Sequence, residues 1–146
     1  MENKIISNYL SIQDNLKPNV KIIAVSKTFE LAKIKPLIDH GHDHFGENKL
    51  QEAHTKWSEI IKNNKSIKLH MIGKLQSNKA KKAVDLFHYI HSLDNQKLSD
   101  VLSRAEKEKN KKLNYFIQVN IGNESQKSGI SVKDLPSFFN YCSIEN

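Results

Sequence analysis

Short apolar runs alternate with segments of helical periodicity along the chain, and this alternation limits the possible folds more than any other feature. Runs rich in apolar and β-branched residues predict strands at 22–27, 44–46, 68–72, 88–93 and 115–121. Apolar residues at the helical period predict helices at 31–41, 50–61, 80–87, 98–105 and 135–142. Because each expected strand is followed by a helix, the sequence predicts an α/β protein with a parallel sheet.

Two further helical features concern the start of the chain. An amphipathic helix is expected over residues 2–16, because one face collects the apolar side chains of Ile5, Tyr9, Ile12 and Leu16. Pro36 lies inside the helical pattern that follows the first strand. Since proline lacks a backbone N–H and disfavours helical geometry at Lys35, this helix is expected to start late or to be kinked.

The first expected strand ends in a lysine. Its residues do not alternate between apolar and polar, so Lys21 to Val25 is predicted to be continuous core, covered on both faces. Lys27 then lies at the carboxyl end of the strand, where ligands gather in such sheets. Apolar surroundings would lower the pKa of its amine and favour the neutral form, a nucleophile toward aldehydes. The strand alone fits equally a lysine that extends into water.

Polar residues also follow the other expected strands. If the strands are parallel, their carboxyl ends bring together Ser26, Lys27, Glu47, Asn48, His70, Gly73, His91, Ser92 and Asn120. A polar rim above an apolar interior is typical of a binding site in this class of fold. Each of these residues has a simpler explanation in turn geometry or helix capping, so the rim by itself does not identify a ligand.

Composition narrows the class of protein. The 146 residues predict one domain, residues 1–146, with a hydrophobic core. The single cysteine, Cys142, excludes an intramolecular disulfide, and the first residues lack the pattern of a signal peptide. No apolar run reaches the length of a membrane span. We therefore expect a cytoplasmic protein that does not enter the membrane.

Charge and histidine content raise two alternatives that the residues do not favour. The net charge of +7 comes almost entirely from lysine, with Arg104 as the only arginine, whereas base recognition relies on arginine and stacking aromatic residues. Nucleic-acid binding is therefore not expected. His40, His42 and His44 suggest a metal, but the sequence has no His-Glu-x-x-His motif and no cysteine pair. No metal site is predicted.

Five motifs, in order along the chain, resemble the pyridoxal phosphate homeostasis protein family. They are Ala24–Thr28, Phe45–Asn48 with Gln51–Ala53, His70–Gly73 with Leu75–Lys79, Ile90–Ser92, and Gln118–Asn120 with Lys127–Gly129. The resemblance implies a fold like the N-terminal barrel domain of alanine racemase. It also implies that Lys27 forms a Schiff base with pyridoxal 5′-phosphate (PLP), and that Lys27, Asn48, His70, Ser92 and Asn120 bind this cofactor.

The resemblance implies a function in intracellular PLP homeostasis without a catalysed reaction. Such a protein would hold the cofactor and release it to recipients, for which PLP-dependent apoenzymes are the candidates. The alternative is a PLP-dependent enzyme of the racemase or lyase type, with His70, His91 and Asn120 as its candidate polar groups. In the related racemases, the second proton-transfer group is a tyrosine of a separate domain, to which nothing here corresponds.

Length sets this chain apart from a closed barrel. A complete eight-stranded barrel takes about 200 residues or more, and this sequence contains about five strand-helix units. The expected fold is therefore a partial, truncated TIM (β/α) barrel. It lacks the family's later strands with the phosphate cradle, so we expect weakened cofactor binding and self-association through the open edge. Leu69, where the family commonly has tryptophan, is a smaller departure.

Overall fold

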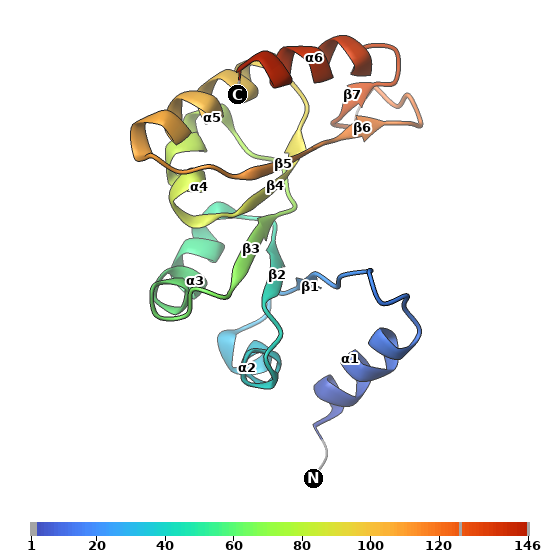
Figure 1. The fold of residues 1–146 in the computed structure, drawn as a ribbon, viewed down its shortest axis with the longest axis vertical. Helices are drawn as coiled ribbons and strands as arrows, with labels where there is room; N and C mark the ends of the chain where they lie inside the picture. Colours follow the sequence, from blue (N-terminus) through green and yellow to red (C-terminus); the bar gives the residue numbers. More distant parts are fainter. Residues whose placement is uncertain (1–2, 126, 146) are drawn as a thin grey trace.

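The computed structural model describes residues 3–125 and 127–145 of the chain. Its main sheet has five parallel strands in sequence order, and helices alternate with them (Figure 1). The strands are β1 (Ala24–Val25), β2 (His44–Glu47), β3 (Lys68–Met71), β4 (Tyr89–Leu93) and β5 (Asn114–Ile117). The helices are α1 (Lys4–Asp14), α2 (Leu31–His40), α3 (Leu50–Asn63), the 3-10 turn η1 (Ser77–Lys79), α4 (Ala80–Leu86), α5 (Gln96–Lys109) and α6 (Leu135–Glu145). The predicted α/β class is confirmed.

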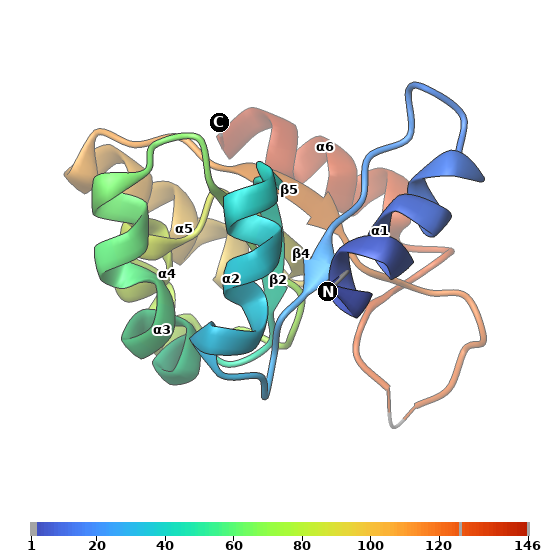
Figure 2. The same ribbon diagram turned by 90° about the horizontal axis from the view of Figure 1, so that it is seen from below.

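Helices α2, α3, α4 and α5 cover one face of this sheet (Figure 2), and the hydrophobic core lies between the two layers. The strand residues on that face, Phe45, Leu69, Met71 and Ile90, are almost completely buried. Trp57 of α3 is also fully buried, and its ring centroid lies 4.8 Å from that of Phe45. Aromatic and aliphatic packing between helices and strands thus holds the strands in place, together with the residues at their carboxyl ends.

The opposite face of the sheet is the one that lines the interior of a closed barrel. Cα register pairs Val25 with Gly46, Gly46 with His70, and His70 with Tyr89, so these residues form a row across four strands. Strands β1 and β5 are the two edges of the sheet within the described residues. The five strands therefore form an open arc, with α1 near one end and the β6–β7 pair near the other (Figure 1). This is the expected partial barrel.

Strand β1 differs from its prediction. Lys21 is exposed and the Val25 residue is 48% exposed, so the run from Lys21 to Val25 is not continuous core. The reason is its place in the sheet, because β1 is an edge strand that pairs only with β2. An apolar run without alternation predicted burial on both faces, and the edge strand is only partly buried.

The fifth expected strand, 115–121, is divided in two. Strand β5 ends at Ile117, and the Gln118 amide still donates to the Leu93 carbonyl, 2.9 Å away. The chain then leaves the main sheet and forms β6 (Val119–Asn120), which pairs in parallel with β7 (Ile130–Ser131). The sequence pattern predicted no strand at residues 130–131. These residues form β7, which is close in sequence to β6 and pairs with it. The periodicity of apolar residues does not predict such a pairing.

The helices agree better with the sequence. Helix α2 begins at Leu31 with Pro36 inside it, so the expectation of a late start is wrong. Burial of Ile34 and packing of Leu37 and Ile38 against the core offset the hydrogen bond that proline cannot donate. Helix α6 buries Phe138 and Cys142. In the described part of the chain, no helix is both long and apolar enough to cross a bilayer.

Candidate functional site

Lys27 lies in a tight turn directly after β1. The Phe29 amide donates to the Ser26 carbonyl, 3.2 Å away, which closes the turn around Lys27 and Thr28. Thr28 has a positive φ of 67°, in the left-handed region that a β-branched residue rarely adopts. Lys27 is exposed, whereas the sequence predicted apolar surroundings. Its amine has no hydrogen-bond or ion-pair partner among residues 3–125 and 127–145.

A buried carboxylate anchors this turn to the sheet. Glu47, the last residue of β2, has no exposed surface. Its Oε1 atom accepts hydrogen bonds from the Ser26 hydroxyl at 2.9 Å, the Lys56 amine at 2.8 Å and the Trp57 indole N–H at 2.8 Å. Its Oε2 atom has no partner in the described residues. The positive charge of Lys56 offsets the cost of burying this carboxylate.

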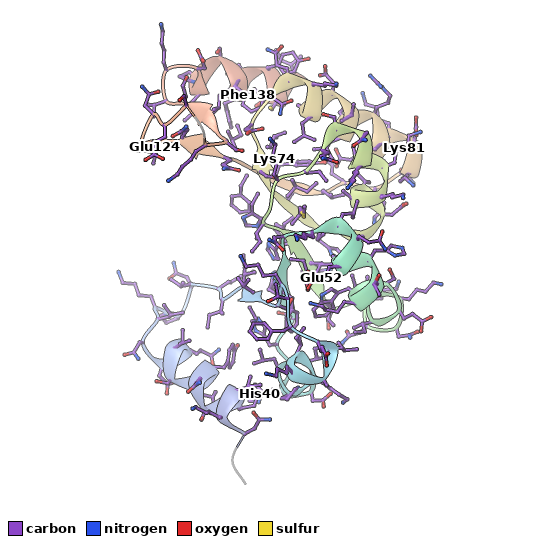
Figure 3. The ribbon with its side chains drawn as sticks, turned by 180° about the vertical axis from the view of Figure 1, so that it is seen from behind. His40, Glu52, Lys74, Lys81, Glu124 and Phe138 are labelled. Carbon is purple, nitrogen blue, oxygen red and sulfur yellow. The ribbon has the colours of Figure 1, made fainter. Side chains whose placement is uncertain are left out.

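Helix α3 holds the same turn through a second acidic residue. Glu52, labelled in Figure 3, accepts a hydrogen bond from the Thr28 amide at 2.6 Å. Lys56 lies 3.3 Å from the same Glu52 oxygen and donates to the Ser26 carbonyl at 2.7 Å. The Thr28 N–H and then the Lys56 amine lower the pKa of Glu52, so this carboxylate stays ionised. We call Ser26, Glu47, Glu52, Lys56 and Trp57 the turn network.

Three histidines form a hydrogen-bonded row on the inner face of the sheet. The Nδ1 atom of His44 lies 2.8 Å from Nε2 of His70, and Nδ1 of His70 lies 2.8 Å from Nε2 of His91. Tyr89 stacks on the His70 ring at 4.2 Å between centroids, and Phe116 stacks on His91 at 4.5 Å. We call His44, His70 and His91 the histidine row.

Burial lowers the pKa of two side chains in the histidine row, His70 and His91. Desolvation, with a smaller contribution from the imidazoles of His91 and His44, lowers the pKa of His70 to about 3. Burial also lowers the pKa of His91. A neutral imidazole has one donor and one acceptor nitrogen, so the central ring can satisfy both of its contacts. The rings of His70 and His91 are therefore uncharged at neutral pH. Among the described residues, no group of three His, Cys, Asp or Glu side chains is arranged so that it could hold a metal ion.

Asn48 and Ser92 lie at the carboxyl ends of β2 and β4 with unused hydrogen-bonding atoms. The Oδ1 atom of Asn48 and the Oγ atom of Ser92 are buried and have no partner in the described residues. Gly73, just beyond β3, packs against the Asn48 backbone so closely that an added Cβ would lie 2.3 Å from the Asn48 carbonyl oxygen. Buried polar atoms are normally paired, so these two atoms are free to meet a ligand.

Asn120 uses its side chain within its own loop. Its amide nitrogen donates to the Glu124 carbonyl at 2.7 Å, and its Oδ1 accepts from the Glu124 amide at 3.3 Å. The loop that contains Glu124 lies beside β6 (Figure 3), and the Gly129 amide ties its end to Asp94 at 2.9 Å. The side chain of Asn120, in the two-stranded β6–β7 sheet, is therefore engaged with Glu124.

Sequence reasoning missed Lys56 and the contacts of Trp57. Trp57 belongs to the apolar pattern of the helix predicted at 50–61, and Lys56 is one of many lysines. The Glu52 and Lys56 spacing of four residues on a clear helix was the available signal, because it places the two side chains next to each other. Their joint contact with the turn around Lys27 depends on how α3 packs, which the spacing does not specify.

The amino-acid sequence matches a known family. The family model described as "Alanine racemase, N-terminal domain" matches residues 2–145. The chain belongs to this family. The chain is 39% identical to the pyridoxal phosphate homeostasis protein of Synechocystis over 88% of its own length and 59% of that relative. Its identity with the Escherichia coli K12 protein of the same name is 34%, over 80% of this chain and 50% of the relative. These matches confirm the resemblance inferred from the motifs.

Solved structures agree with the fold. PipY of Synechococcus elongatus without PLP has a TM-score of 0.90 and 36% identity over 98% of this chain and 66% of its own. PipY with PLP bound has a TM-score of 0.88 and 35% identity over the same shares of the two chains. Alanine racemase of Clostridium difficile, at 12% identity and a TM-score of 0.73, covers 94% of this chain and 36% of its own, and shows the fold alone. The chain thus spans about half to two thirds of the length of the homeostasis proteins and of PipY.

Proposed function

We propose that this chain is the lysine-bearing part of a PLP-holding protein in PLP homeostasis, with Lys27 as the residue that holds the cofactor covalently. The observation that carries the proposal is the Lys27 amine, which has no partner among the described residues, on a turn that a buried network holds at the carboxyl edge of the sheet. Relatives named pyridoxal phosphate homeostasis proteins and the PLP-bound structure of PipY support it.

The residues present suit this cofactor. PLP supplies an aldehyde, a phosphate and a ring with polar substituents, and a lysine amine condenses with the aldehyde to a Schiff base and water. Lys27 provides the amine. Asn48 Oδ1 and Ser92 Oγ are buried polar atoms that have no hydrogen-bond partner in the described residues. His70 contributes an uncharged aromatic ring to the inner face. Asn120 orders the loop that contains Glu124, so its proposed role is to shape the site.

Holding the cofactor, without a reaction of its own, is the function we propose. The relatives are named for homeostasis and not for a reaction. The competing enzymatic function makes a distinct prediction, because a racemase or lyase labilises the α-hydrogen of an amino acid. Exchange of that hydrogen for deuterium, dependent on Lys27 and PLP, would favour the enzyme. We also propose that PLP-dependent apoenzymes receive the cofactor and that the protein is cytoplasmic. Reactivation of apoenzymes by the PLP-loaded protein tests the first point, and cell fractionation tests the second.

Covalent trapping tests the role of Lys27. Borohydride added to the protein with PLP should reduce the C=N bond and leave a stable pyridoxyl label on the peptide that contains Lys27. Lys27→Ala should lose the visible absorption band and the label, while its far-ultraviolet circular dichroism stays unchanged. Lys33→Ala, which alters another exposed lysine nearby, is the matched control. A label spread over surface lysines that spares Lys27 would contradict the proposal.

A further inference from the structure

We propose that Glu52 and Lys56 of α3 are positioning residues that hold the Lys27 side chain in the direction required for its reaction with an aldehyde. The two side chains lie one helical turn apart and reach the turn after β1 from the helical layer. This inference rests on the proposed function, since it concerns how the reactive amine is presented. Neither residue is expected to touch the cofactor, so both would act through the backbone of Lys27.

The pair holds both peptide groups that flank Lys27. The peptide before Lys27 contributes the Ser26 carbonyl, which accepts from the Lys56 amine at 2.7 Å. The peptide after Lys27 contributes the Thr28 amide, which donates to Glu52 Oε1 at 2.6 Å. Fixing these two peptide planes restricts the φ and ψ angles of Lys27, and with them the direction of its Cα–Cβ bond. Charge-assisted hydrogen bonds of this kind are stronger than those between neutral groups.

The turn needs such support for two reasons. Thr28 has a φ of 67°, and a strained backbone angle persists only when the surrounding contacts enforce it. Strand β1 is short and pairs only with β2, and the contacts of the sheet with the turn, through Glu47 and the Gly46 carbonyl, are made to Ser26, before Lys27. Lys56, whose side chain is only 8% exposed, is itself held by Glu47 at 2.8 Å. The support thus extends from the turn to the fully buried carboxylate of β2.

This burial separates the pair from an ordinary ion pair on a helix surface. An exposed pair at the same spacing contributes little to stability and orders little else. Lys35 and Asp39 on α2 form such a pair at 2.7 Å, with side chains 65% and 61% exposed. They offer a control, because the spacing and the residue types are similar, whereas the pair is exposed and makes no contact with the turn.

The test measures how fast Lys27 acquires the borohydride-reduced PLP label, by peptide mass spectrometry at limiting PLP. Lys56→Met and Glu52→Ala should each slow labelling of Lys27 at least tenfold, because the amine must then find its direction by chance. Lys56→Arg, which keeps a charged donor, should recover part of the rate. In the Lys35→Met variant, Lys27 should acquire the label at the wild-type rate. Wild-type rates in both Lys56→Met and Glu52→Ala would overturn the inference.

A second measurement, made without PLP, follows hydrogen exchange of the Thr28 amide by NMR. Exchange should become at least tenfold faster in Glu52→Ala and stay unchanged in Lys35→Met. If Lys56→Met fails to fold, Glu52→Ala alone tests the positioning role, because Glu52 is partly exposed and its replacement is better tolerated. Both the labelling rate of Lys27 and the exchange rate of the Thr28 amide can be measured in that variant. A wild-type protein unlabelled at Lys27 would refute the proposed function, whereas unchanged Thr28 exchange in Glu52→Ala would refute the positioning role separately.

Discussion

Gly73 shows how a single residue limits the candidate site. An added Cβ would lie 2.3 Å from the Asn48 carbonyl oxygen, a backbone atom that cannot rotate away. We expect Gly73→Ala to lower the free energy of unfolding by about 1–3 kcal/mol, as overpacking does, and to displace Asn48. Urea denaturation measures the loss. Gly122→Ala is the control, because its nearest contact would be 3.8 Å away, and an equal loss there would contradict the explanation.

At the scale of elements, strands β2, β3 and β4 share the histidine row, and its burial makes stability depend on pH. The pKa of His70 is lowered to about 3 and that of His88, beside β4, to about 4. An unfolded histidine titrates near 6.5, so between these values the unfolded chain binds more protons than the folded one. The stabilisation is complete above pH 6.5 and is lost as the pH falls toward 3.

Urea denaturation between pH 7 and pH 4 tests this dependence. For His70 alone, the lowered pKa corresponds to a loss on the order of 3 kcal/mol over that range. His70→Gln should flatten the pH profile, because a group that cannot titrate replaces the histidine. His54→Gln, at an exposed position on α3, should leave the profile unchanged. A profile for His70→Gln as steep as that of the wild type would show that His70 is not the source.

At the scale of the whole molecule, the open arc predicts association. Within residues 3–125 and 127–145, β1 and β5 are the edges of the sheet, and Val25 and Phe116 on its inner face remain 48% and 53% exposed. Unpaired edges and exposed apolar surface favour pairing between chains. Sedimentation should therefore detect oligomers of this segment. Phe116→Ser should weaken association more than Phe139→Ser on α6, and a compact monomer at high concentration would contradict the prediction.

A protein with the complete barrel provides a second test of the prediction that open edges cause association. The relatives extend beyond the matched region, since this chain covers 59% of the Synechocystis protein and 50% of the Escherichia coli protein. Appending the remaining strand-helix units of a relative should yield a monomer that binds PLP at least tenfold more tightly than residues 1–146. Phosphate contacts are charge-assisted hydrogen bonds of about 1.5–3 kcal/mol each. Equal affinities in a PLP titration of both proteins would refute this expectation.

The amino-acid sequence alone determined the alternation of strands and helices, the parallel sheet and the position of Lys27 at a strand end. Periodicity and residue type carry this information, because burial of one face repeats at a fixed spacing. The family motifs added the cofactor and the candidate residues Asn48, His70, Ser92 and Asn120.

Tertiary structure decided what those residues contact. Val25 is half-exposed because β1 is an edge strand, and the chain divides after Ile117 because residues 130–131 return to pair with β6. Lys56 reaches the Ser26 carbonyl, and His70 lies between His44 and His91, only because α3 and three strands pack at particular distances. These contacts join residues far apart in sequence, and their geometry depends on packing, which local patterns do not encode.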